Sequence, residues 1–245
     1  MKSILDHTYD TFNPEAFLAV DPCGTVHQLM QHTDSQLDIE LGALLVAMIS
    51  WGSRKVIVPT AIHMLRDEMH WQPAHFIKSG EYAQSYHDAK RQCVYRTLNV
   101  PTFHHVCHNL QHELDGYDTM EARLNNLTAK DAIAEICRWL APARLGTMPS
   151  SACKRVCMFM RWMVRPYYPD LGLWTSRSPA DLYAVMDTHV CQQTRHLLKH
   201  KRPTWQACEE LTALFNSWNP ADPLRYDIAL MTLADSKNDT ALASP

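Results

Sequence analysis

The chain has 245 residues, of which 46% are hydrophobic and 20% charged, and its net charge at pH 7 is -3. This composition suffices for a buried core and excludes a disordered chain, while the absence of an apolar run long enough to cross a bilayer excludes a membrane-spanning helix. Acidic residues stand where a signal peptide would need an apolar run, and the eight cysteines are scattered, so we expect a cytoplasmic protein with reduced thiols.

The predicted elements are all helices. Seven glycines and few alternating runs of Val, Ile or Thr leave little material for sheets, which predicts an all-α fold. A first helix is expected over 38–51, between a Ser35 cap and a Gly52 stop, and a second over 55–69, with Pro59 in its first turn. Further helices are expected over 103–114, 129–140, 151–164, 189–199, 205–218 and 223–233.

The charge is distributed unevenly along the chain. Residues 151–202 contain nine Lys or Arg against three Asp or Glu, whereas residues 1–150 contain 12 against 17 and residues 203–245 two against six. A local basic surface is what contacts with nucleic-acid phosphates require. A solvated charged face is the alternative interpretation of this segment.

Two side chains in the basic segment suggest chemistry. Ser150 or Ser151 can cap a helix whose first turn contains Lys154, with Arg155 beside it, and this placement would lower the lysine pKa and favour a neutral amine. Asp187 directly precedes an amphipathic helix, where capping would hold it ionised. A fixed carboxylate near an amine nucleophile is suited to cleaving a glycosidic bond and capturing the sugar as a Schiff base. An ordinary surface lysine and an ordinary cap are the alternatives.

A helical wheel divides residues 154–165 into two faces. The face that we expect to be basic and reactive comprises Lys154, Met158, Arg161 and Arg165. The face that we expect in the core comprises Val156, Met160, Met163 and Val164.

These segments together resemble the helix-hairpin-helix DNA glycosylase superfamily, which includes endonuclease III and the 8-oxoguanine glycosylases. The resemblance rests mainly on D-T-H-V at 187–190, and the 33-residue separation of Lys154 from Asp187 is similar to that in the archaeal 8-oxoguanine glycosylases. A closer likeness is to a bacterial family of unknown function, through D-I-E-L-G-A-L-L at 38–45, W-G-S-R-K at 51–55, C-K-R-V-C-M-F-M-R-W-M-V-R at 153–165 and D-P-L-R-Y-D-I-A-L at 222–230.

The resemblance implies a fold and an activity. We expect one glycosylase-like domain over 1–235, built as two helical subdomains with a cleft between them, followed by a flexible tail over 236–245. The N- and C-terminal segments would pack together, and residues from about 100 to 200 would form the hairpin-bearing subdomain. The implied protein is a monomer that acts on double-stranded DNA as a glycosylase with AP lyase activity, removing an oxidised base such as 8-oxoguanine. Lys154 would attack the anomeric carbon while Asp187 stabilises the cationic sugar.

The basic segment and the resemblance also indicate which residues meet the DNA. The expected DNA contacts are Ser150, Ser151, Arg155, Arg161, Arg165 and His189. The expected base pocket comprises Trp51, Gly52, Ser53, Arg54, Met158, Tyr226 and Asp227. Plain core packing is the alternative for Trp51 and Tyr226.

Departures from the superfamily pattern bear on cofactors and on the hairpin. The stretch L-G-T-M-P-S-S-A-C at 145–153 has one glycine where the usual hairpin has two, and no cysteine follows Cys208, so we expect no iron-sulfur cluster. His104, His108 and His112 share a helical spacing but lack a carboxylate partner, and Cys153 with Cys157 lacks a second thiol pair. We therefore expect no metal or other cofactor.

Two functions without catalysis are the alternatives. A DNA-binding protein of the same fold would use the basic segment alone, but it would not need both Lys154 and Asp187. A helical interaction module would present the basic face to an acidic protein partner. Salt-sensitive binding to random duplex DNA would separate this last function from the others.

Overall fold

The computed structural model describes the backbone of residues 1–86 and 93–242, and the side chains of those residues up to 234. It is mostly helical, which confirms the all-α prediction. Within this described part, the only sheet is an antiparallel hairpin of β1 (Cys93–Tyr95) and β2 (Leu98–Asn99). None of the described helices is long and apolar enough to span a membrane.

The α-helices are α1 (Lys2–Asp10), α2 (Pro14–Leu18), α3 (Pro22–Leu29), α4 (Gln36–Ile49), α5 (Arg54–Ile62), α6 (Pro73–Lys78), α7 (Val100–Glu113), α8 (Met120–Leu124), α9 (Ala129–Trp139), α10 (Lys154–Val164), α11 (Thr188–Thr194), α12 (Trp205–Trp218) and α13 (Arg225–Leu242). A π-helix, η1 (His63–Glu68), continues α5, and short 3₁₀ turns are η2 (Glu81–Gln84), η3 (Ala141–Ala143) and η4 (Pro179–Asp181).

The predicted helices are all present, with differences at their ends. Helix α4 begins after Ser35, whose Oγ accepts the N–H of Asp38 at 3.3 Å, as the cap pattern predicts. Pro59 lies inside α5 rather than in its first turn, because the helix already begins at Arg54. The shorter α1, α2, α3, α6 and α8 were not predicted, since so few turns show little hydrophobic periodicity. Helix α13 continues into the segment that was predicted to be a flexible tail.

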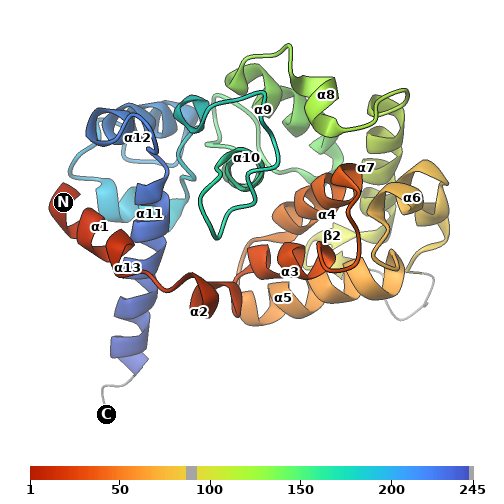
Figure 1. Ribbon diagram of the computed structural model, residues 1–245, viewed down its shortest axis with the longest axis horizontal. Helices are drawn as coiled ribbons and strands as arrows, with labels where there is room; N and C mark the ends of the chain where they lie inside the picture. The colour runs from red at the N-terminus through yellow and green to blue at the C-terminus, as the bar shows by residue number, and fades with distance from the viewer. Residues whose placement is uncertain (87–92, 243–245) are drawn as a thin grey trace.

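Helix α10 lies near the middle of the molecule (Figure 1). It packs against α4 and α9. Helices α3 to α8 lie on one side of it, and α1 lies with α11, α12 and α13 on the other. Helix α1 packs along α13, so the two ends of the chain meet in the same group of helices.

Helix α4 anchors one side of the site. It is buried on all faces from Leu37 to Ile49. Its one deeply buried carboxylate, Glu40, accepts hydrogen bonds from the backbone N–H of Met120 at 2.5 Å and from the indole N–H of Trp174 at 2.6 Å. Burial raises the pKa of Glu40 against the opposing effect of these hydrogen bonds. A helix held in this way fixes the position of the turn that follows it, at 51–53.

Candidate active site

The first turn of α10 carries Lys154. The helix begins at that residue, after Cys153 in a left-handed conformation with φ of 49°. Neither predicted serine caps the helix, because Ser151 Oγ accepts the N–H of Cys153 at 3.1 Å and Ser150 Oγ donates to the carbonyl of Thr147. That prediction was wrong: the left-handed residue places the helix start three residues later than expected, beyond the reach of these hydroxyls.

Lys154 and Asp187 lie together. The Nζ atom of Lys154 is 2.9 Å from Oδ2 of Asp187, and both side chains are largely covered, with exposed fractions of 35% and 27%. Asp187 is the N-cap of α11, and its Oδ1 accepts the N–H of Val190 at 2.9 Å. One carboxylate oxygen is therefore fixed by the helix and the other faces the amine.

The surroundings keep Asp187 ionised. Burial raises its pKa, but the charge of Lys154 and the hydrogen bond from Val190 lower it by more, so the net pKa lies below the usual 3.8. A carboxylate of this kind is negative at neutral pH and fixed in direction. It can stabilise a positive charge that develops beside it.

The pair borders a cavity of about 110 Å³ between α10, α11, α13 and the turn after α4. Among the predicted pocket residues, those lining this cavity are Trp51, Gly52, Arg54, Met158 and Asp227. The same pair also borders a wider groove of about 900 Å³, whose lining includes Ser53, Lys55, His189 and Gln193. The structure thus brings most of the predicted site residues around Lys154, and their roles stay predictions.

Contacts from the hairpin fix the turn at Trp51. The hydroxyl of Tyr95 donates to the carbonyl oxygen of Trp51 at 2.5 Å, and the guanidinium of Arg96 lies 4.4 Å from the centre of the Trp51 ring. Gly52 follows with φ of 98°, and a Cβ there would lie 2.1 Å from Nη1 of Arg96. The backbone conformation therefore favours glycine at this position, and any Cβ here would displace the guanidinium of Arg96.

Asp227 is another carboxyl group of the cavity, which Asp187 and Asp21 also line. It is 2% exposed, and its Oδ2 accepts the N–H of Val185 at 2.9 Å. Its Oδ1 has no hydrogen-bond partner within the described part of the chain. Burial raises the pKa of Asp227 to about 7, despite the opposing charge of Arg161. This carboxyl group can therefore gain or lose a proton near neutral pH.

Comparison with known proteins identifies the family but no function. Residues 21–235 match a family described as "Protein of unknown function (DUF2400)". The chain belongs to this DUF2400 family. Searches of curated proteins and of solved structures found no significant match. The matched range contains Lys154, Asp187 and every predicted pocket residue of this DUF2400 protein.

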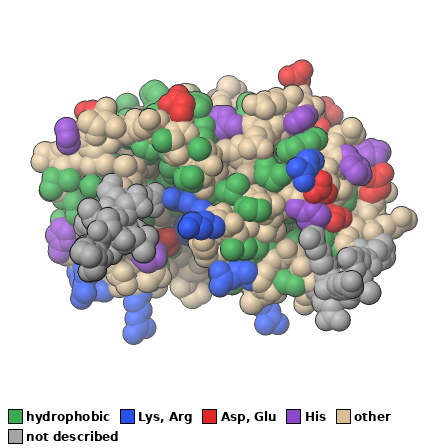
Figure 2. Space-filling view, turned by 90° about the horizontal axis from the view of Figure 1, so that it is seen from below, with side chains coloured by type: hydrophobic (Ala, Val, Ile, Leu, Met, Phe, Trp, Pro, Cys, Tyr) green, Lys and Arg blue, Asp and Glu red, His purple; other side chains and the backbone are tan. Residues whose placement is uncertain are grey.

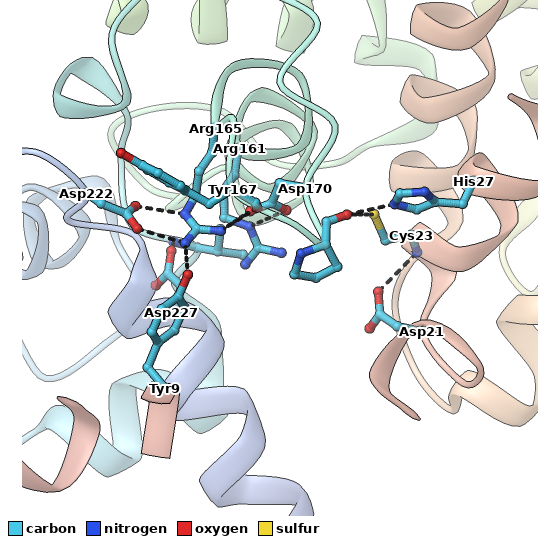
Figure 3. A network of polar contacts seen from close by, with 12 residues as sticks. Tyr9, Asp21, Cys23, His27, Arg161, Arg165, Tyr167, Asp170, Asp222 and Asp227 are labelled. Atoms are coloured by element: carbon cyan, nitrogen blue, oxygen red, sulfur yellow. Dashed lines mark hydrogen bonds and ion pairs between the residues drawn. The ribbon is translucent and has the colours of Figure 1, made fainter. Parts of the chain in front are cut away.

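Two predicted DNA contacts, Arg161 and Arg165, are instead buried in the core (Figure 3). Arg161 Nε lies 3.2 Å from Asp170, and Arg165 lies 3.0 Å from Asp170 and 2.7 Å from Asp222. Arg165 also donates to the hydroxyl of Tyr9. The prediction for these two arginines was wrong, because the helical face that they share with Lys154 runs into the interior, where two aspartates neutralise them. Asp170 and Asp222 were not singled out from the sequence.

Tyr226 is likewise a core residue and not part of the pocket. It is 1% exposed, its hydroxyl donates to Asp6 at 3.0 Å, and its ring lies 5.3 Å from those of Phe215 and Trp218. It lines neither the cavity nor the groove. The adjacent Asp227 does line the cavity, since neighbouring residues on a helix point in different directions.

The other predicted DNA contacts lie on or near the surface. Ser150 is exposed, Ser151 and Arg155 are half-buried, and His189 borders the groove beside Lys154. Figure 2 shows Lys and Arg side chains in the middle and along one edge of the face seen from below, while most of the visible Asp and Glu side chains lie toward its rim.

Two of the histidines of α7 contact hydroxyl groups. His104 contacts the hydroxyl of Ser85, and His108 contacts that of Tyr82. Within residues 1–86 and 93–242, no three His, Cys, Asp or Glu side chains are placed so that they could hold a metal ion.

Proposed function

We propose that this protein excises a damaged base from duplex DNA as a glycosylase with associated AP lyase activity. The observation that carries the proposal is the contact of 2.9 Å between Lys154 and Asp187 at the border of a cavity. The sequence resemblance to helix-hairpin-helix glycosylases supports it, since in that superfamily such a pair is catalytic. The arrangement of helices on both sides of α10 is consistent with two subdomains of that kind.

The chemistry follows from the two side chains. A base that leaves the duplex stack enters the groove that Lys154 and Asp187 border, and the negative charge of Asp187 stabilises the positive sugar that forms as the glycosidic bond weakens. The neutral amine of Lys154 attacks the anomeric carbon, a C–N bond to the enzyme forms, and the bond to the base breaks with transfer of a proton to the base. Opening of the sugar ring gives a Schiff base, and loss of a proton from the neighbouring sugar carbon then expels the 3' phosphate.

Asp227 has a role that fits this scheme. The ammonium of Lys154 must lose a proton before attack, and the leaving base must gain one. A carboxyl group with a pKa of about 7 in the cavity that Lys154 borders is suited to both transfers at neutral pH.

Borohydride trapping tests the proposal. The full-length protein is incubated with duplexes that contain 8-oxoguanine, an abasic site or no lesion, and covalent product is measured. We expect product on the 8-oxoguanine duplex with the native protein and with Lys55→Gln, the matched control, because Lys55 borders the same groove. The Lys154→Gln variant should give no covalent product but should still bind the duplex.

The other outcomes are also informative. Product on the abasic duplex alone would keep the lyase chemistry and replace 8-oxoguanine by another lesion. Absence of product on every duplex, with duplex binding intact, would contradict catalysis and favour a non-catalytic DNA-binding protein.

A further inference from the structure

A second cavity, of about 530 Å³, lies next to the candidate active site. Trp51 is among the residues that line both cavities. The first turn of α10 contributes one cation to each, Lys154 to the first and Arg155 to the second. The volume is within the range of roughly 300–1,000 Å³ that is usual for small-molecule sites.

The second cavity is positively charged. Arg144 and Arg155 line it, and no Asp or Glu is among the described lining residues, although the whole chain is acidic. Arg155 is half-buried, its Nη1 donates to the carbonyl oxygen of Met48 at 2.9 Å, and it forms no ion pair within the described residues. Burial lowers the pKa of this guanidinium. A covered cation without a counter-charge favours an anionic ligand.

Two aromatic residues also line this cavity. The rings of Trp51 and Tyr95 meet edge to face at 5.8 Å, and the hydrogen bond from Tyr95 to the Trp51 backbone holds them in place. Thr97 and Thr102 also line the cavity. A cavity lined by two aromatic side chains and two guanidinium groups suits a ligand that has both a planar ring and a phosphate.

We propose that this cavity binds one nucleotide, with its phosphate at Arg144 and Arg155 and its base against Trp51 and Tyr95. A free mononucleotide and an unpaired nucleotide within a DNA strand share this chemistry. Binding in this cavity requires no reaction at Lys154. The binding proposal can therefore be tested independently of the proposed glycosylase activity.

Isothermal titration calorimetry at low salt tests the proposal. The probes are deoxyguanosine monophosphate, deoxyguanosine, inorganic phosphate, a fully paired duplex and the same duplex with one unpaired guanosine. We expect either the mononucleotide to bind about tenfold or more tightly than the nucleoside and phosphate, or the bulged duplex to bind about tenfold or more tightly than the paired one. The first result assigns the site to a free nucleotide and the second to a nucleotide in DNA.

The variants locate the site. Arg144→Gln and Arg155→Met should each weaken that binding about tenfold or more. Arg66→Gln, which removes the same charge from an exposed side chain paired with Asp67, should leave it unchanged. Lys154→Gln should also leave it unchanged, which separates this site from the catalytic one. Three results would overturn the proposal. The first is equal binding of phosphate and mononucleotide together with no preference for the bulged duplex. The others are absence of any binding, and binding that neither arginine variant weakens.

Discussion

The ammonium of Lys154 lies 2.9 Å from Oδ2 of Asp187, although 33 residues separate them in the sequence. Each residue stands at the N-terminal end of a helix, Lys154 in the first turn of α10 and Asp187 as the cap of α11. The contact therefore depends on how two helix ends are packed, and the hydrogen bond from Val190 directs the carboxylate.

Replacing Asp187 by Asn separates its charge from its capping role. The Asn side chain can still accept the N–H of Val190, so we expect the free energy of unfolding to change by less than about 1 kcal/mol. Without the negative charge, the single-turnover rate of base excision should fall about 100-fold or more. Affinity for duplex DNA serves as the control, and it should be the same for the variant as for the native protein. An unchanged rate would show that the carboxylate has no part in catalysis.

Replacing Asp227 by Asn should change how stability depends on pH. The pKa of Asp227 is about 7 in the folded protein against 3.8 ordinarily, so the folded state holds the proton more tightly than the unfolded state. The protonated Asp227 carboxyl group therefore contributes to the free energy of unfolding. This contribution, roughly 2–4 kcal/mol, is fully present below about pH 4 and is lost as the pH rises through about 7.

Urea unfolding at pH 5 and pH 8 measures this effect. The native protein should lose stability between the two pH values, and Asp227→Asn should lose clearly less. The exposed Asp118→Asn is the matched control and should behave like the native protein. Parallel curves for the native protein and Asp227→Asn would contradict the raised pKa.

Replacing Arg165 by Met tests its assignment to the core. The change leaves the carboxylate of Asp222 without its partner and that of Asp170 with Arg161 alone, so we expect a loss of about 3–5 kcal/mol of unfolding free energy, measured with urea. Affinity for random duplex DNA, measured where the variant is folded, should be unchanged. Reduced affinity with native stability would instead restore Arg165 as a DNA contact.

Replacing Gly52 by Ala should disturb the turn that carries Trp51. The new Cβ would meet the guanidinium of Arg96, in addition to the strain of a positive φ. Gly116→Ala is the matched control, because Gly116 has φ of 78° and nothing within 4 Å of the added Cβ. We expect a stability loss of about 1 kcal/mol for Gly116→Ala from strain alone. Gly52→Ala should lose more and shift the tryptophan fluorescence, and equal effects would show that the approach of Arg96 is unimportant.

Local patterns in the sequence were enough to predict most of the long helices, because caps and apolar spacing act within a few residues. Ser35 and the range 205–218 illustrate this. The resemblance through D-T-H-V also predicts Asp187 as a site residue, and the place of Lys154 in the first turn of a helix upstream matches the catalytic lysine of that superfamily. What lies opposite a helix face, however, is decided by segments distant in the chain.

Tertiary structure alone decided the rest. Arg161 and Arg165 share a helical face with Lys154. These two arginines are buried in the core, where they pair with Asp170 and Asp222, whereas Lys154 contacts Asp187 at the cavity. The second cavity depends on bringing the hairpin, the turn after α4 and the first turn of α10 together. A helical period defines which side chains point the same way, but only packing determines whether they meet solvent, a counter-charge or a cavity.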